Sequence, residues 1–168
     1  YGGSDLGILT FGLVLEQLGR QLTASPLLPS ALAGASALLL GGSAAQKEAM
    51  LPNIIDGTAI LTLAVDEGTH HRPESTALEA RASDGGFTLS GSKASVAEGS
   101  AATHFVIAAR TAGTPGDDEG VSLFLVAADS AGISRTALNV LDSRDYANIL
   151  LDDVHVDADA LLGSLNGG

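Results

Sequence analysis

The chain has 168 residues, of which 45% are apolar and only 4% aromatic, so we expect a globular fold with a core of Leu, Ala, Val and Ile. Eight Lys and Arg stand against 20 Asp and Glu, a formal net charge of -12. Because nucleic acids and anionic membranes are bound through clustered cations, we expect neither as a partner. The absence of Cys excludes disulfides and thiolate metal sites, and with no recognisable signal peptide we expect a cytoplasmic protein.

Residues 1–56 carry apolar side chains at the spacing of amphipathic helices. A first helix is expected after Ser4 or Asp5, either of which can cap it. Its apolar stripe is so broad that we expect burial on more than one side. A second helix is predicted from about Ser30 to Leu40, ended by the glycine pair that follows. A third is predicted to begin with the capping-box sequence at 43–46.

From Thr58 onward the pattern changes to short apolar runs separated by turn residues. These runs cover residues 59–65, 77–82, 87–89, 104–109, 121–126, 147–151 and 154–156. Short strands at regular spacing predict an antiparallel β-barrel or sandwich, and helices followed by strands make an α+β fold. We therefore expect a helical segment at 1–56, a β-domain at 57–157, and the start of a linker at 158–168.

Seven short motifs follow one another along the chain. They are Tyr1-Gly2-Gly3 with residues 15–20; 42–47 with 51–52 and 56–57; 63–67; 89–93; 105–111; 121–126; and 153–156 with 159–163. Each motif alone is weak. Together, in this order and at this spacing, they resemble the acyl-CoA dehydrogenase family over nearly the whole chain.

The resemblance implies a helical domain, a β-barrel and a C-terminal four-helix bundle, with FAD between barrel and bundle and often a neighbouring subunit at the site. It also implies a reaction of lipid metabolism, the α,β-dehydrogenation of an acyl-CoA thioester, in which a glutamate removes the α-proton and FAD accepts the β-hydride. That glutamate belongs to the C-terminal part, so we predict no catalytic residue in this chain. Since the chain starts at Tyr1 without Met, we expect a fragment that is inactive alone and belongs to a homo- or hetero-oligomer.

The same resemblance implies that seven residues in two strand segments face the flavin. They are Leu63, Ala64, Val65 and Asp66 in the first segment, and Ser95, Val96 and Ala97 in the second. Backbone contacts from Leu63, Val65 and Val96 need no particular side chain. The cofactor that the resemblance implies is therefore FAD, held partly by the main chain.

Three of these positions depart from the family pattern. Asp66 stands where the family has Thr; a carboxylate only accepts hydrogen bonds, so it can take the flavin N3–H but opposes negative charge on reduced flavin. Ser95 stands in place of Trp, which removes an aromatic packing surface. Ala97 stands in place of Thr, which removes a hydroxyl donor near flavin N5. We therefore expect FAD to be bound weakly or shared with a partner subunit.

Three functions remain open on this reading. The first is a subunit of an FAD-dependent acyl-CoA dehydrogenase, the second a non-catalytic, flavin-poor subunit of a hetero-oligomeric acyl-CoA dehydrogenase, and the third an acyl- or lipid-binding β-domain. A C-terminal helical region with a Glu facing the flavin would favour the first, and such a region without that Glu the second. A gene that encodes no such region would favour the third.

Two groups of ionisable residues suggest other chemistry. They are His70-His71 with Asp66, Glu67 and Glu74, and the alternating residues Asp153, His155 and Asp157. Adjacent side chains rarely point at one metal ion, so we interpret the first group as an exposed loop and predict no metal site. Alternation along a strand puts the second group on one face, which we expect to be solvated.

Overall fold

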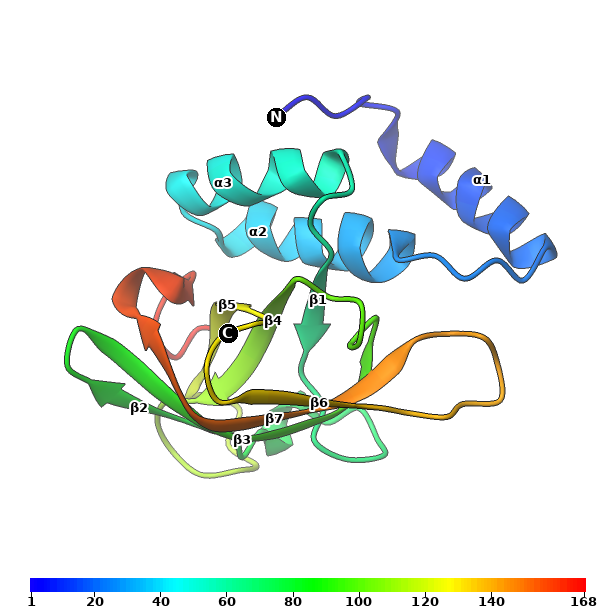
Figure 1. Ribbon diagram of the computed structural model, residues 1–168. Coiled ribbons are helices and arrows are strands. Elements are labelled where there is room, and N and C mark those ends of the chain that lie inside the picture. The colour runs from blue at the N-terminus through cyan, green and yellow to red at the C-terminus, as the bar shows by residue number, and fades with distance from the viewer.

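The computed structural model describes residues 1–168 as a layer of helices above a strongly bent β-sheet (Figure 1). The layer contains α1 (Gly7–Arg20), the π-helix η1 (Leu27–Gly34), α2 (Ala35–Gly41) and α3 (Ala44–Ile55). Two single turns of 3-10 helix, η2 (Pro73–Ser75) and η3 (Ala158–Ala160), lie among the strands. The predicted α+β order, helices first and strands second, is confirmed. None of the helices combines the length and the apolar character that crossing a membrane requires.

The start of α3 shows the predicted capping box. The Ser43 hydroxyl accepts from the Gln46 N–H at 3.2 Å, and Gln46 Oε1 accepts from the Ser43 N–H at 2.9 Å. Gln46 also donates through Nε2 to the carbonyls of Asp159 at 2.8 Å and Leu161 at 3.2 Å. Gln46 therefore helps to cap α3 and also links the helical layer to the last strand of the sheet.

The first helix differs from expectation in two ways. Its N-cap is Leu6, with no side-chain hydrogen bond, so neither Ser4 nor Asp5 caps it. None of its residues is buried, and Leu9 keeps 78% of its surface exposed. The expected burial on more than one side is thus wrong for this chain, because only η1 and α2 lie against α1, across a groove of about 570 Å³.

The second helix begins at Leu27 rather than Ser30 and opens as a π-helix before it becomes α2. Pro29 lies in its first turn, where a missing N–H costs no internal hydrogen bond. The Ser25 hydroxyl accepts from the Leu27 N–H at 3.2 Å and satisfies one of the free donors at this end. The helix ends at Gly41, as the glycine pair predicts.

The sheet has eight strands in the order β6-β7-β3-β2-β4-β5-β8, with β1 paired to β4. The strands are β1 (Leu61–Ala64), β2 (Glu79–Ser83), β3 (Gly86–Ala97), β4 (His104–Arg110), β5 (Val121–Ala127), β6 (Ile133–Ala137), β7 (Tyr146–Asp157) and β8 (Leu161–Leu162). Pairing is antiparallel except for β1 and β2 against β4. The sheet does not close, since β6 pairs only with β7 and β8 only with β5. Of the predicted barrel or sandwich, the closed barrel is therefore not formed, and the strands make an open, folded-over sheet.

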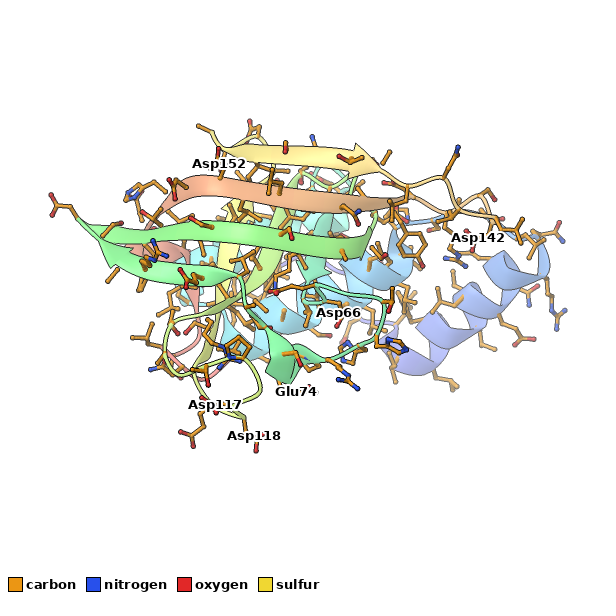
Figure 2. All side chains as sticks on the ribbon, turned by 90° about the horizontal axis from the view of Figure 1, so that it is seen from below. Asp66, Glu74, Asp117, Asp118, Asp142 and Asp152 are labelled. Atoms are coloured by element: carbon orange, nitrogen blue, oxygen red, sulfur yellow. The ribbon has the colours of Figure 1, made fainter.

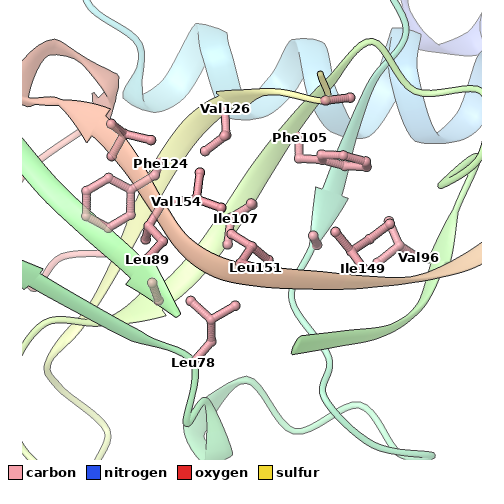
Figure 3. Close-up of a cluster of buried hydrophobic side chains, with 14 of the residues drawn as sticks. Leu78, Leu89, Val96, Phe105, Ile107, Phe124, Val126, Ile149, Leu151 and Val154 are labelled. Atoms are coloured by element: carbon pink, nitrogen blue, oxygen red, sulfur yellow. The ribbon is translucent and has the colours of Figure 1, made fainter. Parts of the chain in front are cut away.

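Two apolar clusters hold these layers together. The larger fills the inside of the bend, where Phe105 and Ile107 of β4 meet Ile149 and Leu151 of β7 (Figure 3). Phe124, also in this cluster, packs edge-on against Phe87 with ring centroids 5.0 Å apart. The smaller cluster joins the helices to the outer face of β1, β4 and β5; its buried members are Leu38, Met50, Leu51, Ala59, Leu61, Val106 and Leu162.

Residues 158–168, assigned from the sequence to the start of a linker, run back along the sheet. Leu161 and Leu162 pair with Phe124 and Leu123 of β5. The N–H of Gly168 donates to the Val121 carbonyl at 2.9 Å. This part of the chain therefore packs as an edge of the β-domain, held by the apolar Leu162 and by main-chain hydrogen bonds.

Candidate functional site

The two segments predicted to face a cofactor lie side by side. The end of β1 and the residues after it run next to the second half of β3. Three hydrogen bonds to main-chain carbonyls join them: Thr62 Oγ1 to the Ala97 carbonyl at 2.8 Å, Lys93 Nζ to the Val65 carbonyl at 2.9 Å, and the Ala94 N–H to the Asp66 carbonyl at 2.8 Å. Residues about thirty positions apart thus form one continuous surface.

Four of the seven predicted residues turn their side chains into the protein or partly into it. Ala64 and Val96 are buried in the larger core cluster; Val96 is labelled in Figure 3. Leu63 packs against the smaller cluster under the helices, and Val65 is half-buried beyond it. These residues can meet a ligand mainly through their backbone, whereas Asp66, Ser95 and Ala97 keep exposed side-chain surface.

Ser95 lies in a β-bulge. The register between β3 and β7 shifts between Lys93 and Val96, so β3 carries one residue more than its partner. Ser95 has φ +51°, a left-handed conformation that is uncommon for a residue other than Gly. Its N–H donates to Asn148 Oδ1 at 3.0 Å, which holds the bulge in place. The exposed serine at this point offers a small hydroxyl where the family pattern has an indole.

The carboxylate of Asp66 is occupied by the loop that follows it (Figure 2). One oxygen accepts from the Arg72 N–H at 3.0 Å, and the other lies 3.0 Å from His71 Nδ1. Although burial, the largest single influence, acts to raise it, these hydrogen bonds and the nearby charges hold the pKa of Asp66 below its usual 3.8. The hydrogen bond to Asp66, helped by its charge, raises the pKa of His71. The two carboxylate oxygens of Asp66, which the sequence suggested as acceptors for a flavin N–H, are therefore bound to residues of the loop that follows.

Glu67 forms a buried ion pair with Lys93 that the sequence reasoning missed. Its Oε1 accepts from Lys93 Nζ at 2.7 Å and from the Leu78 N–H at 2.9 Å, and its Oε2 from the Ala77 N–H at 2.9 Å. Burial lowers the pKa of Lys93, and Glu67 acts against that shift. Strand alternation predicts that Lys93 is buried, since it stands four residues after the core residue Leu89 and so faces inward.

Arg110 fastens the same loop from the other side. Its guanidinium is buried and donates to the carbonyls of Thr76 at 2.8 Å, Glu74 at 2.8 Å and Glu119 at 2.9 Å. It therefore joins the loop at 65–78 to the hairpin at 111–120. Between them lies a hollow of about 430 Å³, lined by residues that include Val65, His71, Glu74, Asp118 and Leu123.

The ionisable groups considered for other chemistry do not converge. His70 Nδ1 lies 3.0 Å from Thr69 Oγ1, whereas His71 binds Asp66, so the two rings have different partners. The chain contains no group of three or more His, Cys, Asp or Glu arranged to hold a metal. On β7, Asp153, His155 and Asp157 are all exposed, as expected for a solvated strand face.

The surface formed by the two segments fits a flavin through its backbone. The N–H of Asp66 donates to no group of the chain, so it is free to bind a carbonyl oxygen of an isoalloxazine ring. The side chains contribute little: the Asp66 carboxylate is occupied, and Ala97 has no donor. The Val65–Asp66 peptide is thus the group that would hold FAD here, next to residues 95–97, where the Ser95 N–H is bound by Asn148 and the Ala97 carbonyl by Thr62.

Two domains of one protein family match almost the whole chain. Residues 65–154 match the acyl-CoA dehydrogenase middle domain, and residues 1–58 match the acyl-CoA dehydrogenase N-terminal domain. The chain therefore belongs to the acyl-CoA dehydrogenase family.

Individual relatives show the same pattern. The chain is 32% identical over 96% of its length to acyl-CoA dehydrogenase FadE27 of Mycobacterium tuberculosis, of which it spans 41%. Among solved structures it resembles a chain of the ChsE4-ChsE5 complex of the same organism, with 31% identity and a TM-score of 0.83 over 97% of this chain and 42% of that one. It also resembles a glutaryl-CoA dehydrogenase of Mycobacterium smegmatis in complex with FADH2, with 26% identity and a TM-score of 0.71 over 79% of this chain and 34% of that one. The chain thus spans less than half the length of these relatives.

Proposed function

We propose that this chain is part of a subunit of an FAD-dependent acyl-CoA dehydrogenase that catalyses the α,β-dehydrogenation of an acyl-CoA thioester. The observation that carries the proposal is the side-by-side placement of residues 63–66 and 95–97, with the Asp66 N–H left unpaired. Family membership and a solved relative in complex with FADH2 support the choice of cofactor.

Each part of the site has a distinct role in this proposal. FAD, when bound, supplies the hydride acceptor. The Val65–Asp66 peptide would bind its ring edge, and the bulge at Ser95 would set the position of residues 95–97 beside that edge. Glu67 and Arg110 hold the neighbouring loop in shape by binding main-chain N–H groups and carbonyls. No residue of this chain is assigned as the base.

A second candidate is a flavin-poor subunit of a hetero-oligomeric acyl-CoA dehydrogenase. It is favoured by the occupied carboxylate of Asp66, since this group opposes negative charge on reduced flavin and offers no donor. The absent hydroxyl at Ala97 acts in the same direction. One solved relative is itself the ChsE4-ChsE5 complex, and an analogous partner subunit would then provide the missing contacts to FAD.

The absorption spectrum of the full-length protein separates the two candidates. The protein would be purified alone and, separately, after co-expression with a neighbouring dehydrogenase subunit. A flavin band close to one per chain in the protein alone supports the first candidate. Flavin only in the mixed preparation supports the second, and flavin in neither preparation rejects both.

A further inference from the structure

Lys93 lies in β3 with its side chain wholly withdrawn from solvent. Burying an ammonium group is unfavourable unless hydrogen-bonded partners compensate, and replacing a buried ion pair with apolar side chains of similar volume is often neutral or stabilising. Packing alone therefore does not explain a charge at this position. The groups that the ammonium touches indicate what the charge does.

The ammonium contacts one carboxylate and one peptide group. It donates to Glu67 Oε1 at 2.7 Å and to the Val65 carbonyl at 2.9 Å. That carbonyl belongs to the peptide whose N–H is the unpaired N–H of Asp66. Hydrogen bonds in series polarise one another, so a cation on the carbonyl makes the N–H at the other end of the same peptide a stronger donor.

Building on the proposed function, we propose that Lys93 is a positioning residue for the flavin, acting through the Val65–Asp66 peptide to favour the reduced, more negative form of the cofactor. Glu67 acts in the opposite direction, because its carboxylate offsets part of the ammonium charge. The cation also counters the carboxylate of Asp66, which lies on the same segment. The ion pair of Lys93 and Glu67 thus determines the electrostatic potential at the Val65–Asp66 peptide, where the chain is proposed to meet the edge of the flavin ring.

The midpoint potential of the bound flavin tests this, measured on the full-length protein together with any partner subunit it needs. Glu67→Gln keeps the cation and removes the opposing charge, so the potential is expected to rise. Lys93→Met combined with Glu67→Gln removes both charges without leaving one unpaired, so the potential is expected to fall. Each shift should correspond to about a tenfold change in the preference for reduced over oxidised flavin, or ~30 mV for a two-electron couple.

Arg81→Met combined with Glu79→Gln is the matched control. Arg81 and Glu79 form an exposed ion pair on β2, so this double variant removes one cation and one carboxylate without changing the net charge, as the double variant at Lys93 and Glu67 does. Because exposed charges are screened by water and salt, the potential should stay unchanged in this variant.

Opposite shifts in the two site variants support the role of Lys93. Equal potentials in wild type and both variants, with flavin bound normally, overturn it even if the variants are less stable. The amide proton shift of Asp66, read by NMR in flavin-free protein, gives a second measure: it should move in opposite directions in the two variants, and no movement also overturns the inference. Absence of flavin in every wild-type preparation rejects the proposed function instead, while the NMR measurement still decides whether Lys93 polarises this peptide.

Discussion

The hydroxyl of Thr62 in β1 donates a hydrogen bond of 2.8 Å to the carbonyl of Ala97 at the end of β3. Thr62 is almost fully buried and Ala97 is half-buried, so this bond runs from the interior to the surface proposed to meet the flavin. It is one of four hydrogen bonds that link the end of β1 and the residues after it to the second half of β3, and the only one donated by a side-chain hydroxyl.

Replacing Thr62 with Val should therefore loosen the site. The substitution keeps the shape of the side chain but leaves the carbonyl of the half-buried Ala97 without this donor, which should cost about 1 kcal/mol of unfolding free energy. Urea denaturation measures the change. Thr136→Val, on the exposed edge strand β6, should change stability by less than about 0.5 kcal/mol, and an equal loss in both variants would contradict the role given to Thr62.

Restoring the family side chains should strengthen flavin binding. Asp66→Thr combined with Ala97→Thr removes a carboxylate that opposes reduced flavin and adds two hydroxyl donors. A gain of about 1 kcal/mol per added hydrogen bond predicts a flavin affinity higher by more than about tenfold, measured by titrating flavin-free protein with FAD. Asp152→Thr with Ala131→Thr makes the same chemical changes at exposed positions away from the site; an equal gain there would show that the site is not responsible.

The pair of Asp66 and His71 should make the loop at 66–72 sensitive to pH. The pKa of His71 is raised, so its contribution is present below its unfolded value near 6.5 and is lost as the pH rises through the folded pKa. The pKa of Asp66 is lowered, so its contribution is present above 3.8 and is lost as the pH falls through the folded pKa. Protection of the loop from proteolysis should therefore be greatest in mildly acidic solution, between these two limits.

An NMR titration of the histidines checks the cause. In Asp66→Asn, the pKa of His71 should fall toward its ordinary value, because the charged partner is gone. His104, whose pKa burial lowers, lies on β4 and should titrate identically in both proteins. An unchanged pKa for His71 would mean that the hydrogen bond to Asp66 does not form in solution.

Arg110→Met should destabilise the β-domain. The variant keeps much of the aliphatic volume but removes the hydrogen bonds to the carbonyls of Glu74, Thr76 and Glu119, of which Glu74 keeps the Gly116 N–H as a donor. At about 1 kcal/mol for each lost hydrogen bond, the expected cost is about 3 kcal/mol. Calorimetry should show a lower Tm for Arg110→Met and almost none of that change for Arg81→Met, where the replaced cation is exposed.

Local sequence signals predicted the local features of this fold. The Ser43–Gln46 capping box and the helix stop at Gly41 depend on residues a few positions apart, and both are present. Alternation predicted the exposed face of β7 in the same way. These features are decided by short-range geometry, so a single sequence is enough to find them.

The parts that were missed depend on partners distant in the sequence. Asn148 holds the bulge at Ser95 through a hydrogen bond, and Glu67 pairs with the charge of Lys93. The sheet stays open because β6 pairs only with β7 and β8 only with β5, and no local sequence pattern predicts this pairing. In the same way, the sequence identified Asp66 as a departure from the family but not that His71 and Arg72 would occupy its oxygens.

The hydrogen bonds of Arg110 affect which residues around it can be substituted. Its three donors bind only main-chain carbonyls, and every amino acid has one. The exposed residues 74 and 119 can therefore be exchanged without releasing the guanidinium, and at Glu74 the wall of the hollow between the two loops can acquire a new side chain while keeping its shape. An arginine kept at position 110 would thus allow the same scaffold to be refitted to different ligands.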